Sequence, residues 1–106
     1  MKLGIVITGI LPETVFNAFR LANFSIKEGD DVAVFLLGEG VELEEINDKR
    51  FDVQAQVRSF VDIGGKIMAC GTCLKLRDSE GTDICPVSTM KDLHELIKDS
   101  DKVMTF

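Results

Sequence analysis

The sequence contains no tryptophan and no tyrosine, and it has only two prolines and one histidine. All seven aromatic residues are phenylalanine, which favours a role in core filling over one as a stacking platform. The scarcity of proline, together with 45% hydrophobic residues, excludes a disordered or low-complexity chain. Twelve Lys and Arg residues against 18 Asp and Glu residues give a net charge of −6, which argues against a nucleic-acid or anionic-membrane partner.

Long apolar segments are also missing. No stretch approaches the roughly 18 apolar residues of a membrane-spanning helix, and the apolar run over residues 3–7 is too short for a signal peptide. Three cysteines are an odd and small number for a secreted disulfide scaffold. We therefore expect a cytoplasmic protein with free thiols, folded as one domain over residues 1–106.

The pattern of apolar residues predicts strands that alternate with helices. Continuous apolar runs are typical of strands buried on both faces of a parallel sheet, and stripes with a period of 3.6 residues indicate amphipathic helices. The chain therefore predicts a three-layer α/β sandwich with a mostly parallel sheet. The expected strands are 3–7, 32–37, 66–69 and 103–106, and the expected helices are 13–28, 52–63 and 90–99.

Most turns of this predicted sheet carry no recognisable chemistry. The acidic stretch 39–48 is typical of a solvated helical turn or loop. The glycine turns at 8–9 and 38–40 lack both the Gly-Lys-Ser/Thr of a phosphate-binding loop and the Gly-x-Gly-x-x-Gly of a dinucleotide fold. No serine lies between nucleophile-elbow glycines, and with a single histidine no general base is evident. These observations predict ordinary tight turns after the first two strands.

The turn after the third predicted strand is different, because it contains a thiol. Cys70 is expected to end that strand, and residues 71–77 are expected to begin a helix. In open α/β sheets the working site lies beyond the carboxyl ends of the strands. A thiol there would face unpaired backbone N–H groups, and Lys75 and Arg77 add positive charge nearby. We therefore expect Cys70 to be partly exposed and to have a lowered pKa.

The spacing of the other cysteines leaves several possibilities open. Cys73 lies one helical turn after Cys70, which permits a disulfide, a shared metal or simple packing. The Cys-Gly-Thr-Cys sequence also has the spacing of a dithiol oxidoreductase motif, although thioredoxin-like folds usually carry it nearer the amino end. A zinc site would need Cys70 and Cys73 with Cys85 and His94, but only one chelating pair is present. Taken alone, Cys85 is typical of packing and His94 of a helix surface.

Three segments, in this order and spacing, resemble the DsrE/TusD type of small sulfur-relay protein. They are residues 34–41 with the Gly-Val turn, residues 66–70 followed by Arg77, and the closing residues 101–106. The resemblance extends over essentially the whole chain. It implies a DsrE-like fold that assembles into homotrimers or homohexamers.

The same resemblance implies a persulfide relay between a sulfur-donor protein and a sulfur-acceptor protein. Cys70 matches the cysteine that accepts sulfane sulfur, Arg77 would stabilise the anionic sulfur, and Cys73 is an additional thiol one turn away. This interpretation involves neither a cofactor nor a metal. The alternative is a non-enzymatic oligomeric subunit, or a thiol redox sensor or dithiol reductase that uses the Cys70–Cys73 pair.

Overall fold

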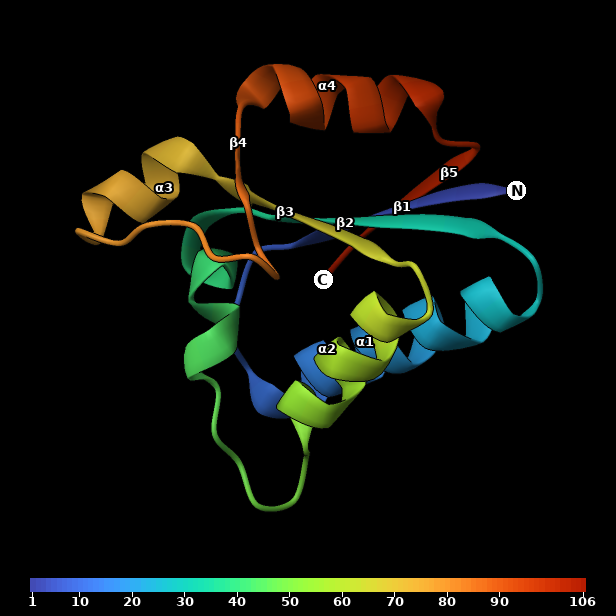
Figure 1. Ribbon diagram of the computed structural model, residues 1–106, viewed down its shortest axis with the longest axis horizontal. Helices are drawn as coiled ribbons and strands as arrows, with labels where there is room; N and C mark the ends of the chain where they lie inside the picture. Colours follow the sequence, from blue (N-terminus) through green and yellow to red (C-terminus); the bar gives the residue numbers. More distant parts are fainter.

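The sheet has five strands, and all of its neighbouring pairs are parallel. The computed structural model describes residues 1–106 and places the strands in the order β4-β3-β2-β1-β5 (Figure 1). The predicted three-layer α/β sandwich is therefore confirmed, with a sheet that is entirely rather than mostly parallel. The strands are β1 (Lys2–Ile7), β2 (Asp31–Leu36), β3 (Lys66–Cys70), β4 (Val87–Ser88) and β5 (Lys102–Thr105).

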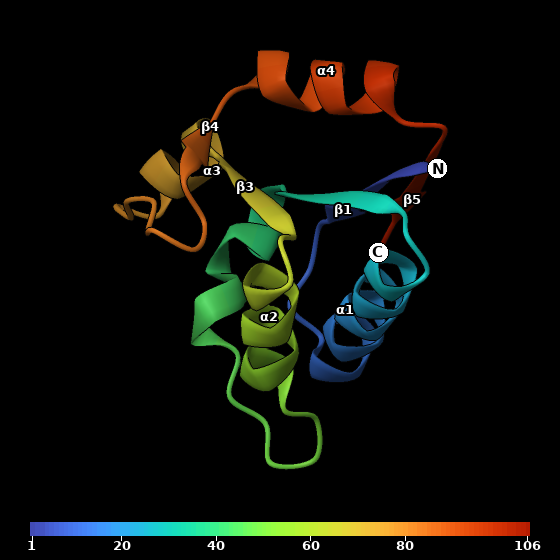
Figure 2. The same ribbon diagram turned by 45° about the vertical axis from the view of Figure 1, so that its right-hand side comes forward.

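Helices cover the two faces of the sheet unequally. The long helices α1 (Pro12–Lys27) and α2 (Val53–Asp62) lie together on one face, and α4 (Met90–Asp99) lies alone on the other (Figures 1 and 2). The short helix α3 (Gly71–Leu76) and the 3-10 helix η1 (Gly38–Glu45) lie beyond the carboxyl ends of the strands. This arrangement leaves the α4 face with the thinner cover.

The core is divided by the sheet in the same unequal way. Because successive strand side chains point to opposite faces, alternate residues of β1, β2 and β3 belong to two separate clusters. The cluster beneath α1 and α2 contains 19 buried residues and is centred on the edge-to-face pair Phe19 and Phe60, 5.5 Å between ring centres. The cluster beneath α4 contains only six: Val6, Phe35, Met68, Cys70, Leu93 and Leu96. The smaller cluster holds Cys70, and the larger cluster holds Cys85.

Local signals in the sequence account for most of the element boundaries. Pro12 occupies the first turn of α1, where its missing N–H costs nothing. Thr89 and Asp92 form a complete capping box at the start of α4. Strand β4 was not predicted, since two residues are too few to show periodicity. No helix is long and apolar enough to cross a bilayer.

Candidate functional site: a thiol pair at the carboxyl edge of the sheet

Cys70 is the last residue of β3, as predicted, and its side chain lies on the α4 face of the sheet. There it belongs to the cluster that contains Phe35, Leu93 and Leu96. Its exposed fraction is only 3%, so the prediction of a partly exposed thiol is wrong. The physical reason is tertiary packing, because α4 supplies two leucines that close over the end of the strand.

Cys73 lies one turn later on α3 and is half-buried. Its Sγ accepts a hydrogen bond from the backbone N–H of Gly38 at 3.2 Å. Burial is the main cause that raises the pKa of the Cys73 thiol, and a hydrogen bond with the Cys70 thiol and the charge of that group raise it further. The Gly38 N–H and the Arg77 charge act in the opposite direction without cancelling the rise in pKa. The two thiols lie at the same apolar cluster beneath α4, Cys70 inside it and Cys73 at its edge.

Arg77 ends α3 and connects it to η1. Its Nε donates to Oε2 of Glu42 at 2.9 Å, and one terminal nitrogen donates to the backbone oxygen of Cys73 at 3.1 Å. The guanidinium therefore acts on the Cys73 thiol through its charge, while its own hydrogen bonds hold the two short helices together.

Cys85 lies apart from the thiol pair. It belongs to the large cluster beneath α1 and α2, on the opposite face of the sheet from Cys70. Burial raises the pKa of Cys85 to about 12, and the charge of Glu44 and a hydrogen bond to that carboxylate act in the same direction. Such a thiol is protonated at neutral pH and chemically inert, which agrees with the packing role.

The four-ligand zinc hypothesis is not supported. No group of three or more His, Cys, Asp and Glu side chains is placed to hold a metal ion. Cys85 lies across the sheet from Cys70, and His94 is exposed on α4. The persulfide relay at Cys70, the dithiol chemistry of Cys70 with Cys73 and a purely structural role of these residues remain as alternatives.

Sequence reasoning missed the contribution of η1. The sequence predicts a tight turn at 38–40 and a solvated helical turn or loop over 39–48, yet Gly38 bonds to Cys73 of α3 and Glu42 bonds to Arg77 at its end. The signal was present, because β2 and β3 were both predicted strands of one parallel sheet. Neighbouring parallel strands bring their carboxyl ends to one edge, so the turns after them meet.

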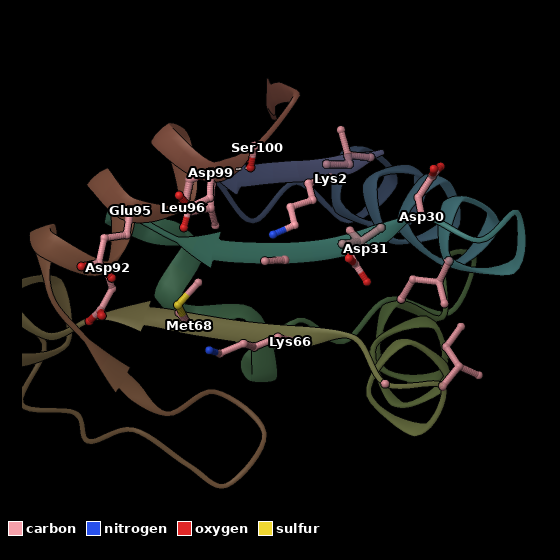
Figure 3. A pocket seen from close by; sticks show the side chains of 16 residues that line it. Lys2, Asp30, Asp31, Lys66, Met68, Asp92, Glu95, Leu96, Asp99 and Ser100 are labelled. Atoms are coloured by element: carbon pink, nitrogen blue, oxygen red, sulfur yellow. Dashed lines mark hydrogen bonds between the residues drawn. The ribbon is translucent and has the colours of Figure 1, made fainter.

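A groove lies at the other end of the same sheet face. It has a volume of about 530 Å³ and runs between α4 and the amino ends of the strands (Figure 3). Lys2 and Lys66 lie on its floor, and Asp92 and Glu95 project from α4 along one wall. Met68 marks its inner end, two residues before Cys70 on the same face of β3. The groove contains neither thiol of the pair.

The fold and the site define a class, namely parallel α/β domains with a thiol at the carboxyl edge of the sheet. Within that class the sequence matches the profile of the DsrE/DsrF-like family over residues 1–106, and the chain belongs to this family. An uncharacterized protein of Methanocaldococcus jannaschii is 30% identical over 114 residues that span 100% of both chains. An uncharacterized protein of Methanopyrus kandleri is 30% identical over 100 residues, covering 89% of this chain and 83% of the relative.

Proposed function

We propose that this protein is a sulfur carrier in which Cys70 accepts sulfane sulfur as a persulfide. The observation that carries the proposal is the position of Cys70 at the carboxyl end of β3, with the Cys73 side chain packed against the same apolar cluster. Membership in the DsrE/DsrF-like family supports it. The donor and the acceptor are each expected to be proteins that present a reactive cysteine.

Loading is a transfer of one sulfur atom. The Cys70 thiolate attacks the outer sulfur of a donor persulfide, R–S–SH, and forms Cys70–S–SH. The S–S bond of the donor breaks, and its electrons leave with R–S⁻. An acceptor thiolate then attacks the outer sulfur of Cys70–S–SH and regenerates the Cys70 thiolate. Because Cys70 is 3% exposed beneath Leu93 and Leu96 of α4, loading requires α4 to move aside.

The surroundings of Cys70 suit a carrier that must protect its cargo. The apolar side chains of Phe35, Leu93 and Leu96 keep water and small thiols away from a loaded sulfur. Arg77 places positive charge beside the pair, and the Gly38 N–H supplies a hydrogen bond at its outer end. Hydrogen bonds from backbone N–H groups to anionic sulfur are charge-assisted and stronger than neutral ones.

A second candidate function is reduction of sulfane sulfur, and the packing of Cys70 and Cys73 at one cluster, one helical turn apart, favours it. In this reaction the Cys73 thiolate attacks the inner sulfur of Cys70–S–SH. A Cys70–Cys73 disulfide forms, and HS⁻ leaves with the electron pair of the broken S–S bond. Two thiols are oxidised and one sulfane sulfur is reduced to sulfide, so each turnover needs a thiol reductant to reopen the disulfide.

Mass spectrometry after incubation with glutathione persulfide tests both functions. A carrier is expected to gain the mass of one sulfur atom on Cys70. The Cys70→Ser variant should lose this gain, and the Cys85→Ser variant should keep it. Full loading of Cys70→Ser would show that Cys70 is not the acceptor. A reductase is expected to release one sulfide per loaded sulfur in the wild type. The Cys73→Ser variant should release none, and its loaded Cys70 should persist longer. No adduct on freshly reduced protein would favour a redox sensor or a structural subunit.

A further inference from the structure

The thiol pair also has the features of a site for a soft metal ion. Cys70 is a buried member of the apolar cluster beneath α4, and the half-buried Cys73 packs against the same cluster. The thioether of Met68 lies on the same strand face, two residues before Cys70 (Figure 3). Three sulfur-bearing side chains therefore gather at one place, with no carboxylate or imidazole among the members of that cluster.

We propose that Cys70 and Cys73 together bind one Cu(I) ion per chain as a two-coordinate dithiolate. Thiolates are the ligands that select Cu(I) among the metals of biology, and hard oxygen ligands are not required. Both thiols lose a proton and both sulfurs bond to the metal, so that Cys70–SH, Cys73–SH and Cu⁺ give one Cys70–S–Cu–S–Cys73 unit and two protons. The oxidation state of copper and of sulfur does not change.

The ligand count argues for a monovalent ion over zinc. Structural zinc sites have four protein ligands, and here no third His, Cys, Asp or Glu side chain is placed to complete such a set. Apart from the Met68 thioether, the other members of the Cys70 cluster are the hydrocarbon side chains of Val6, Phe35, Leu93 and Leu96. They exclude water as a further ligand and favour the lowest coordination number.

The charge of the complex is matched by its surroundings. Two thiolates with one Cu⁺ carry a net charge of −1, which must be stabilised at a half-buried position. The Gly38 N–H already donates to the Cys73 sulfur at 3.2 Å, and the Arg77 guanidinium lies against the backbone of Cys73. Partners of this kind around metal ligands typically change metal affinity by about 10–100-fold when they are removed.

The unequal exposure of the two thiols suits uptake and retention of the ion. Cys73 is half-buried, so an incoming copper complex can meet this sulfur first. Cys70 is buried, so the second bond closes inside the protein. Bound copper and a persulfide on Cys70 exclude each other, because both need the same sulfur. The copper site does not depend on the sulfur-carrier proposal, since metal binding requires only the two thiols and no sulfur donor.

Anaerobic titration with tetrakis(acetonitrile)copper(I), in competition with bathocuproine disulfonate, tests the proposal on the intact chain. The wild type and Cys85→Ser are expected to take one copper per chain, and Cys70→Ser and Cys73→Ser are expected to lose it. Met68→Leu, a swap of similar volume, is expected to keep it because two sulfurs suffice. Arg77→Gln should weaken retention about tenfold. Circular dichroism identifies a variant that fails to fold, and Cys70→Ala then replaces Cys70→Ser.

Copper X-ray absorption of the loaded wild type provides a measurement that needs no variant. Two sulfur scatterers and no oxygen or nitrogen scatterer are expected. The assignment would be overturned by a spectrum with four scatterers. It would also be overturned if both Cys70→Ser and Cys73→Ser retain copper, or if Cys85→Ser loses it. Persulfide loading without copper uptake would refute the copper site alone, and copper uptake without persulfide loading would refute the sulfur carrier alone.

Discussion

The backbone N–H of Gly38 donates a hydrogen bond to the thiol of Cys73 across 3.2 Å, between positions 35 residues apart in the chain. This bond joins the turn after β2 to the helix after β3. Because β2 and β3 are parallel neighbours, their carboxyl ends meet at one edge of the sheet. The chemistry of Cys73 is therefore set in part by the backbone conformation of another segment.

Gly38→Ala tests that dependence. Gly38 has φ of +57°, a left-handed conformation that costs a residue with a Cβ about 1–2 kcal/mol. We expect a loss of stability of that order, and relaxation of the turn is expected to direct the N–H away from Cys73. Losing this bond raises the pKa of Cys73, so alkylation by iodoacetamide at a fixed pH should slow.

The matched control for Gly38→Ala is Gly29→Ala. Gly29 also has a positive φ, +96°, but it lies in the turn before β2, far from the thiols in the sequence and at the opposite end of that strand. It should lose comparable stability in urea denaturation while the alkylation rate of Cys73 stays at the wild-type value. Equal rates in both variants would mean that the Gly38 bond does not influence Cys73.

Cys85 is expected to make the protein less stable in alkali. Its folded-state pKa is raised to about 12, so the folded state holds the proton more tightly than the unfolded state does. The stability that this group contributes is complete below its unfolded pKa and is lost as pH rises from about 9 towards 12. Urea midpoints of the wild type should fall over that range more steeply than those of Cys85→Ala. Parallel pH profiles would contradict the raised pKa.

Arg77 is expected to influence the reactivity of Cys73 more than the stability of the fold. Its side chain and that of Glu42 are 30% and 31% exposed, and exposed ion pairs contribute about 0–1 kcal/mol. Removing the guanidinium in Arg77→Gln takes away a charge that lowers the pKa of Cys73. The pH profile of Cys73 alkylation should therefore shift to higher pH, with little change in the urea midpoint.

Glu42→Gln separates the charge of Arg77 from its ion pair. This variant breaks the same pair but keeps the positive charge beside Cys73. Its alkylation profile is expected to shift to lower pH or to stay in place. A shift to higher pH in Glu42→Gln as large as that in Arg77→Gln would show that the pair acts by holding α3, not by charge.

The sequence was sufficient to predict the parallel sheet and the place of Cys70 at the end of its third long strand, because continuous apolar runs report strands locally. It was insufficient for the exposure of Cys70. That exposure depends on Leu93 and Leu96, which pack over it from a helix more than 20 residues further along the chain. The Gly38–Cys73 bond was equally hidden, since a glycine turn has no side chain to indicate what its N–H contacts.

The cap of α4 offers a way to expose Cys70. The Thr89 side chain accepts from the N–H of Asp92, and the Asp92 carboxylate accepts from the N–H of Thr89. Thr89→Ala should cost about 1 kcal/mol and loosen the helix that covers the thiol. We expect alkylation of Cys70, read by peptide mass spectrometry, to become faster than in the wild type.

Asp52→Ala is the control for the cap of α4. Asp52 caps α2, which covers the other face of the sheet, by accepting from the N–H of Ala55. This variant should lose about as much stability, about 1 kcal/mol, without exposing Cys70. If both variants label Cys70 equally fast, global unfolding governs access to the thiol, and α4 does not act as its cover.

We propose that the protein assembles with copies of itself, in threes or sixes as the sequence resemblance implies. Phe19, Phe35 and Phe60 fill the core, but the Phe24 side chain on α1 is 61% exposed, beside Leu21 on the same helix. Exposed aromatic residues with an apolar neighbour are typical of subunit contacts.

Light scattering at micromolar concentration should give a mass several times 11.7 kDa, and Phe24→Glu should lower that mass. Glu28→Gln, near the carboxyl end of the same helix, is the control and should leave the mass unchanged. A wild-type mass of 11.7 kDa across the micromolar range would refute self-assembly, and an unchanged mass in Phe24→Glu would exclude this face of α1 as the contact.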